Sequence, residues 1–269
     1  MPDRATGAHV GIIDRATPER IPLAPAYRSD QILAHTSPDD RALPGVPDAQ
    51  WCEFLARSSE AWQPAPERLT VIAPHPIDEV LGAGGMIYSW ARRGLPITVV
   101  SVTDGEAANP AVAELSAVRQ SELRQALRAL SAPATSIHRL GLPDGAVCHH
   151  ENVLFKDLLH YAPAGTTLLA PFERDGHSDN DAVGRVCRHI AAARGVALAR
   201  YPVWMWAYAD PAAVADLRWG TFGLSPQARA AKARAIQCFE SQQRAPLRDP
   251  LAPMRSLGYF ARSFEAFVL

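Results

Sequence analysis

The sequence predicts an α/β protein whose mostly parallel sheet is covered by helices on both faces. From residue 68 onward, short β-branched apolar runs alternate with longer amphipathic stretches, an order typical of strands joined by helices. Some of the strand-like runs, such as residues 69–73, are largely apolar, as in strands buried on both faces. Clusters of polar residues follow several of these runs, at the strand ends where open α/β sheets bind ligands.

Length and composition indicate a globular chain with one core. The chain has 269 residues, of which 48% are hydrophobic and 20% charged, with a formal net charge of −1. This balance argues against nucleic acid as a partner, and the apolar runs are too short for a membrane span. The four scattered cysteines and the lack of a signal-peptide pattern predict reduced thiols and a cytoplasmic location.

Residues 1–62 are predicted to be an N-terminal extension packed on the core, and residues 63–269 the α/β domain. The extension begins as an irregular arm and contains one helix, Asp48 to Trp62, which Pro47 precedes. Residues 63–67, which include two prolines, read as a linker into the domain.

Strands and helices alternate in the predicted domain, and the apolar segment 258–269 is expected to pack back on the body. The expected strands are 68–73, 97–102, 137–140, 166–170 and 197–201. The expected helices are 79–93, 113–130, 152–161, 181–194 and 226–243.

The chain is organised around residues 74–79 (Pro-His-Pro-Ile-Asp-Glu), which follow the first domain strand and precede a helix. Because His75 and Asp78 are three residues apart on one turn, both could reach one metal ion. A lone His-x-x-Asp also occurs often by chance. Gly82, Gly84 and Gly85 weaken the helix that follows, so we expect a ligand or another backbone segment to approach it closely.

Several motifs together resemble the PIG-L/LmbE superfamily of zinc-dependent N-acetylglucosaminyl deacetylases. Residues 74–79 with Gly84-Gly85 resemble its first signature, and residues 176–180 (Gly-His-Ser-Asp-Asn) its second. Further matches are Thr103-Asp104-Gly105-Glu106, Arg119 with Glu122, the Pro143-Asp144-Gly145 segment, and Lys232 with Ser241-Gln242. The resemblance covers about residues 65–245 and implies an LmbE-like, Rossmann-like fold.

The resemblance also implies roles for the residues that match its two signatures. His75 and Asp78 match zinc ligands, and His177 matches the residue that stabilises the oxyanion or donates a proton. Asp179 matches a carboxylate that we expect to orient His177.

Two positions depart from the family pattern. Ile77 stands where the general base belongs, and an aliphatic side chain takes no proton. Asn180 stands where the third zinc ligand belongs, and a neutral amide oxygen is a poorer donor than imidazole. We therefore expect zinc to bind weakly or not at all. His177 could instead complete a set with His75 and Asp78, with Asn180 as a weak fourth ligand.

Four other residues are candidates for the site. Asp104, at the end of the neighbouring predicted strand, is a candidate catalytic group, and Glu79 and Arg119 are candidates for substrate binding. Arg119 could equally form an exposed ion pair with Glu122. Trp206 is a candidate for stacking on a sugar, although the tryptophans of this region could equally belong to the core.

Three functions remain open from the sequence. The first is a deacetylase-type hydrolase of an N-acyl amine (an amino sugar, a thiol conjugate or a natural-product intermediate) with a degraded or remodelled zinc site. The second is a pseudoenzyme that binds a ligand or partner without hydrolysis. The third is a metal-independent biosynthetic enzyme that uses Asp78, Glu79, Asp104 and His177 as acid–base groups. The expected partner is a small molecule, and a homo-oligomer is left open.

Overall fold

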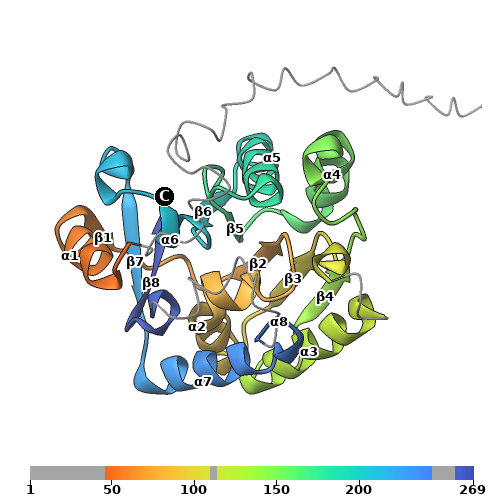
Figure 1. The fold of residues 1–269 in the computed structure, drawn as a ribbon, viewed down its shortest axis with the longest axis horizontal. Helices are drawn as coiled ribbons and strands as arrows, with labels where there is room; N and C mark the ends of the chain where they lie inside the picture. The colour runs from red at the N-terminus through yellow and green to blue at the C-terminus, as the bar shows by residue number, and fades with distance from the viewer. Residues whose placement is uncertain (1–45, 110–113, 244–257) are drawn as a thin grey trace, which may run out of the picture.

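One eight-stranded sheet carries the fold in the computed structural model, which describes residues 46–109, 114–243 and 258–269 (Figure 1). The strand order is β1-β7-β8-β6-β5-β2-β3-β4. The strands are β1 Ser59–Ala61, β2 Arg68–Ala73, β3 Ile97–Ser101, β4 Ser136–Arg139, β5 Thr166–Pro171, β6 Ala197–Tyr201, β7 Trp219–Gly223 and β8 Phe264–Val268. Strand β8 runs antiparallel to β6 and β7, and the other neighbouring pairs are parallel. The prediction of a mostly parallel sheet is therefore confirmed.

Helices cover both faces of the sheet, as the apolar strands require. The helices are α1 Asp48–Ser58, α2 Asp78–Arg92, α3 Leu115–Ala129, α4 Glu151–Leu158, α5 Ser178–Arg194, α6 Met205–Tyr208, α7 Pro226–Gln237 and α8 Glu240–Gln243. Short 3₁₀ turns are η3 Glu106–Ala108, η4 Val147–His149, η5 Leu159–Tyr161, η6 Pro211–Val214 and η7 Tyr259–Ala261. Helices α2, α3 and α7 lie on one face, and α4 and α5 on the other (Figure 1).

Each face of the sheet has its own hydrophobic core, and successive residues of one strand serve different cores. Val71 of β2 packs in the core under α2, α3 and α7, whereas its neighbour Ile72 packs in the core under α4 and α5. Side chains of a strand alternate between faces, so a strand buried on both sides must be apolar throughout.

The strand order places a topological switch point between β2 and β5. From β2 the chain passes through α2 to β3 and then to β4, moving to one side of β2. It returns through α4 to β5, which pairs with β2 on its other side. The connections after β2 and β5 therefore diverge at the carboxyl edge of the sheet, where open α/β sheets bind ligands.

Side chains of neighbouring elements, and not the backbone segment that we expected, approach the glycines of α2 closely. A Cβ atom at Gly82 would lie 2.2 Å from Cδ2 of Tyr201, and one at Gly85 would lie 2.4 Å from Cδ2 of Leu224. The glycines thus allow α2 to pack against β6 and the segment after β7.

The observed elements differ from the predicted ones mainly at the two ends of the domain. The helix expected to reach Trp62 ends at Ser58, and residues 59–61 form β1, which pairs with β7. The proposed boundary between residues 62 and 63 lies in the connection between β1 and β2, two strands of the same sheet, while residues 1–45 of the extension lie outside the described part of the chain. Helix 226–243 is divided into α7 and α8.

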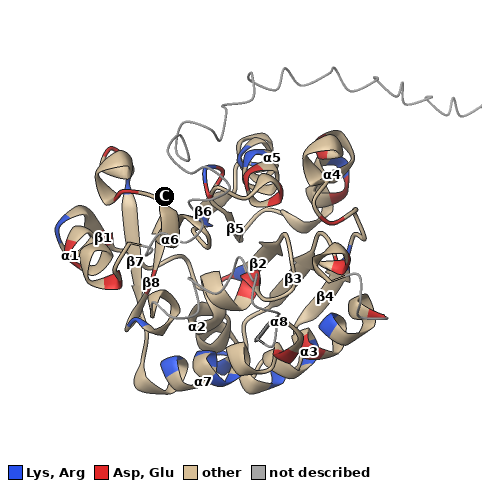
Figure 2. Cartoon of the chain, viewed as in Figure 1, with Lys and Arg blue, Asp and Glu red and all other residues tan. Residues whose placement is uncertain are grey.

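Charged residues of both signs occur on the outer helices, for example on α3 and α4 (Figure 2). Such interspersed charge agrees with the formal net charge of −1. Among the described residues, we find no helix that combines the length and the apolar character needed to cross a membrane.

Candidate functional site

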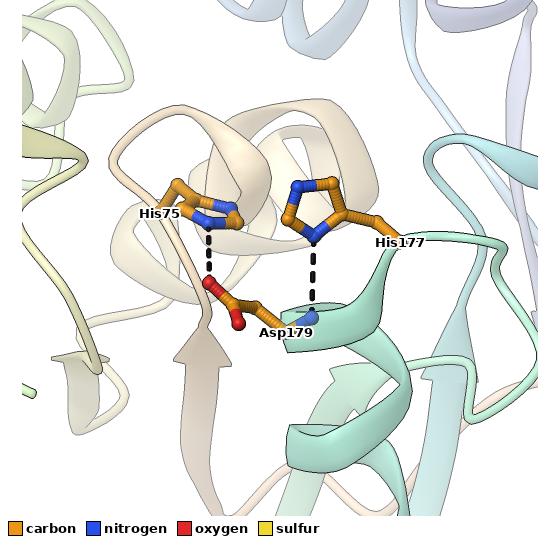
Figure 3. Close-up of side chains that lie close together, drawn as sticks. All are labelled: His75, His177 and Asp179. Atoms are coloured by element: carbon orange, nitrogen blue, oxygen red, sulfur yellow. Dashed lines mark hydrogen bonds and ion pairs between the residues drawn. The ribbon is translucent and has the colours of Figure 1, made fainter. Parts of the chain in front are cut away.

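Two loops bring the signature residues together at the switch point. His75 lies between β2 and α2, while His177 and Asp179 lie at the start of α5, which follows β5 (Figure 3). One potential ligand atom from each of these three residues lies within 4.8 Å of the others. The two imidazole rings meet edge to face, with 4.9 Å between their centroids.

Carboxylates approach both ring nitrogens of His75. Its Nδ1 lies 3.2 Å from Oδ2 of Asp78, and its Nε2 lies 3.2 Å from Oδ2 of Asp179 and 3.2 Å from Oδ1 of Asp144. Burial lowers the pKa of His75, but hydrogen bonds to Asp144, Asp179 and Asp78 outweigh it and raise the pKa well above the usual value. Three carboxylates around one imidazole thus make a small volume that favours positive charge.

Asp179 faces His75 with its carboxylate and His177 with its backbone. Its Oδ2 accepts a hydrogen bond from the backbone N–H of Gly145 (2.8 Å), and its Oδ1 accepts one from that of Val147 (3.1 Å). Its backbone N–H donates to Nδ1 of His177 (3.3 Å), which makes His177 the N-cap of α5. Helix α5 therefore begins at Ser178, three residues before the predicted start, and orientation of His177 by Asp179 comes through the backbone amide.

Asn180 is tied to Asp175 and not to either histidine. Its Nδ2 donates to Oδ2 of Asp175 (2.8 Å), and its own Oδ1 is buried without a hydrogen-bond partner among the described residues. Burial raises the pKa of Asp175 to about 7 against the opposing effect of backbone hydrogen bonds from Val203, Met205 and Trp204. An orphaned buried oxygen is costly, so the Asn180 carbonyl is a ready acceptor for a bound water, ion or ligand.

Ile77, at the position where the resemblance implies a general base, has an unusual backbone conformation. Its φ is 108° and its ψ is −33°, a region that β-branched residues rarely adopt. Its N–H donates to both carboxylate oxygens of Glu79, at 3.2 and 3.3 Å. Glu79 is fully buried, and this burial raises its pKa to about 8. The predicted substrate-binding residue Glu79 thus binds the backbone of the signature loop.

The other three candidates lie in different surroundings. Asp104 forms an ion pair with Arg139 on β4, with Nε of Arg139 donating to Oδ1 at 2.8 Å. Arg119 is buried on α3, and its charge acts on Asp144. Trp206 lies in the aromatic core, 4.9 Å from Trp51 between ring centroids. Neither Asp104 nor Trp206 contacts the two histidines.

The prediction omitted two residues that contact the histidine pair. Asp144 contacts His75, and the ring of Trp204 stacks on that of His177 with 5.2 Å between centroids and 25° between planes. Asp144 could have been suspected, because its motif follows the predicted strand that became β4. Trp204 carries no such signal, since neighbouring tryptophans in one segment do not reveal which of them faces a loop.

Comparison with known proteins points to deacetylases. Residues 70–191 match the family model described as PIG-L, GlcNAc-PI de-N-acetylase. A curated relative, the 1D-myo-inositol 2-acetamido-2-deoxy-alpha-D-glucopyranoside deacetylase of Actinosynnema mirum, is 42% identical over 77 residues. This match covers 24% of the chain and 27% of the relative, so the chain aligns with about a quarter of that protein's length.

Solved structures with the same fold include two from thermophiles. The N,N'-diacetylchitobiose deacetylase of Pyrococcus horikoshii is 20% identical with a TM-score of 0.56, covering 75% of this chain and 82% of its own. The conserved protein TT1542 of Thermus thermophilus is 23% identical with a TM-score of 0.55, covering 75% and 93%. At these identities the structural likeness establishes the fold.

Proposed function

Because this chain contains a PIG-L family domain, we propose that it is a deacetylase-type hydrolase of an N-acyl amine with a remodelled metal site. The substrate class comprises amino sugars, thiol conjugates and natural-product intermediates that carry an N-acyl group. The observation that carries the proposal is the cluster of His75, His177 and Asp179 at the switch point, within the segment that matches the family. The deacetylases among the relatives support the substrate class.

The donor set at the switch point fits a divalent metal ion such as zinc. His75, His177 and Asp179 offer two imidazoles and one carboxylate, which are the ligand types of catalytic zinc sites. Asn180 directly follows Asp179 in α5, and its Oδ1 is buried without a hydrogen-bond partner among the described residues. When bound, such an ion polarises an acyl carbonyl and lowers the pKa of a water molecule. The resemblance implies His75, Asp78 and residue 180 as ligands. In the set proposed here, Asp179 and His177 take the places of Asp78 and residue 180.

When no ion is bound to its ring, His177 is suited to donate a hydrogen bond to the acyl oxygen, a role that excludes metal ligation through the same Nε2 atom. Because its Nδ1 accepts from the backbone N–H of Asp179, the proton of the neutral ring resides on Nε2. Burial and the charge of His75 lower the pKa of His177, which keeps the ring neutral near pH 7. A neutral imidazole with a free N–H stabilises an oxyanion without carrying a net charge.

A second function, ligand binding without hydrolysis, is favoured by the two departures. Ile77 offers no proton acceptor, and the amide of Asn180 is engaged by Asp175. Loss of a positioned base typically slows an enzyme by about 10²–10⁴. The metal-independent alternative is less well supported, because Glu79 is fully buried and Asp104 is paired with Arg139.

Zinc analysis and an amidase assay on reverted variants test the proposal. We expect wild-type protein to retain less than one zinc per chain after dialysis and His75→Ala to lose what remains. Combining Ile77→Asp with Asn180→His should raise zinc toward one per chain and increase hydrolysis of N-acetyl amino sugars by about 10²-fold or more, because base and ligand return together. Acetate release and elemental analysis measure the two effects.

The outcomes separate the two functions. Asn152→His, on the exposed face of α4, is the matched control and should change neither zinc content nor turnover. A full zinc equivalent in dialysed wild-type protein would refute the weakened site. A reverted variant that holds zinc but cleaves no N-acyl amine in a panel of sugars and thiol conjugates would favour ligand binding.

A further inference from the structure

A continuous series of contacts connects Asn180 to His177 through two other residues. Nδ2 of Asn180 donates to Oδ2 of Asp175 at 2.8 Å. The same oxygen accepts the backbone N–H of Trp204 at 3.1 Å. The indole of Trp204 then stacks on the imidazole of His177, with 25° between the ring planes. Asn180 can thereby act on His177 without contacting it.

Asp175 is a rigid link because backbone amides surround its carboxylate. Its Oδ1 accepts the N–H groups of Val203 (2.8 Å) and Met205 (3.1 Å), so three successive amides converge on one side chain. Asp175 is 1% exposed, and its own N–H donates to Oδ1 of Asp181 at 2.8 Å. Among the described contacts, Asn180 is the one residue that donates to the Asp175 carboxylate through its side chain. Removing the Asn180 amide should therefore weaken the turn at 203–205.

The ring of His177 is confined by three neighbours. Trp204 covers one face, the edge-to-face ring of His75 lies 4.9 Å away between centroids, and the N–H of Asp179 donates to Nδ1. Loss of the Trp204 stack would uncover one face of the imidazole and leave only the other two neighbours to restrict its rotation about the side-chain bonds. A hydrogen-bond donor that must meet a developing charge loses effect when its orientation is not fixed in advance.

We propose that Asn180 is a positioning residue, which through Asp175 holds the 203–205 turn so that Trp204 stays stacked on His177. Asn180, which stands where the resemblance implies a zinc ligand, would thus have a different role, in positioning His177. The catalytic consequence rests on the function proposed above, whereas the stack can be tested without turnover.

The ring current of Trp204 provides a direct reading of the stack. In ¹H–¹³C spectra, we expect the His177 ring resonances, assigned with His177→Gln, to be shifted by the indole, and Trp204→Leu to abolish that shift. Asn180→Asp places a second carboxylate beside Asp175 and should abolish most of the same shift, whereas Asn152→Asp should leave it unchanged. Asn180→Ala tests the same link if Asn180→Asp does not fold.

Spectra recorded before and after chelation distinguish positioning from metal ligation. If Asn180 acts through Asp175, its substitution moves the His177 resonances equally in both states. An effect that disappears after chelation, or His177 resonances that stay in place in both Asn180 variants, would overturn the proposal. Where turnover is measurable, we expect Asn180→Ala and Trp204→Leu to lower kcat more than they change KM. Absence of turnover in every variant would count against the proposed function and leave the spectral test intact.

Discussion

At the scale of single residues, the motifs identified a group of neighbouring side chains but not the pairing of their atoms. The structure brings His75, Asp78, His177 and Asp179 to one place. It also shows that Asp179 presents its carboxylate to His75 and only its backbone amide to His177. Motif spacing cannot specify such pairing, because it depends on how two loops about 100 residues apart meet in space.

Ile77 allows a test of backbone strain at the position where the family resemblance implies a general base. We expect Ile77→Gly to be more stable than Ile77→Ala by about 1–3 kcal/mol, the usual cost of an unfavourable backbone conformation. Both variants remove the buried side-chain atoms beyond Cβ, and only glycine, which also lacks Cβ, adopts a φ of 108° without a clash. Urea denaturation measures the difference in unfolding free energy.

The control for Ile77 is a helical position at which alanine is expected to be more stable than glycine. At Val153, exposed in α4, alanine should be more stable than glycine by about 0.5–1 kcal/mol. If alanine is also the more stable residue at position 77, the signature loop is relaxed and the positive φ carries no cost.

At the scale of elements, α2 is held by an ion pair that binds its backbone. Nζ of Lys232 on α7 donates to the carbonyl of Leu81 and to Oε1 of Glu265, both at 2.7 Å. The carboxylate of Glu265 accepts the N–H groups of Gly85 (2.7 Å) and Met86 (2.9 Å). A charged pair therefore takes part in the hydrogen bonding of the helix that starts at Asp78. The sequence showed the Lys232 motif and the glycines but not their connection to β8.

Breaking this pair should destabilise the protein strongly. We expect Glu265→Gln and Lys232→Met each to cost about 3–5 kcal/mol, because each leaves a buried polar partner unmatched. The double variant should cost clearly less than the sum of the two, since no charge is then left alone. Urea denaturation of the wild type, the two single variants and the double variant completes a double-mutant cycle. Strictly additive losses of unfolding free energy would mean that Lys232 and Glu265 do not act as a unit. Arg218 with Glu60, an exposed ion pair, is the control and should give less than about 1 kcal/mol.

At the scale of the whole molecule, the sequence predicted the five parallel strands β2 to β6 and their helices but not the edge formed by β1, β7 and β8. Three of them, β2, β3 and β5, have runs rich in apolar and β-branched residues that identify them. Strand β7 contains two glycines, and β8 carries the buried Glu265, so neither has the pattern of a central strand. The sequence predicted that residues 258–269 pack back on the body, but no local pattern shows that they pair with β6 and β7 in the sheet.

The position of β8 predicts how this edge responds to damage. Because β8 lies between β6 and β7, it is the only strand that joins the β1–β7 pair to the rest of the described sheet. Ala266 is buried and pairs with Thr221, so Ala266→Pro should remove a ladder hydrogen bond and loosen β8. We expect hydrogen–deuterium exchange to speed up in residues 59–61 and 219–223 while β2 and β5 remain protected. Ala164→Pro, in the exposed turn before β5, should leave all these segments unchanged. Equal acceleration in β2 and β5 would show that the sheet opens as one cooperative unit, with β8 as much a part of the core as the strands that carry the histidines.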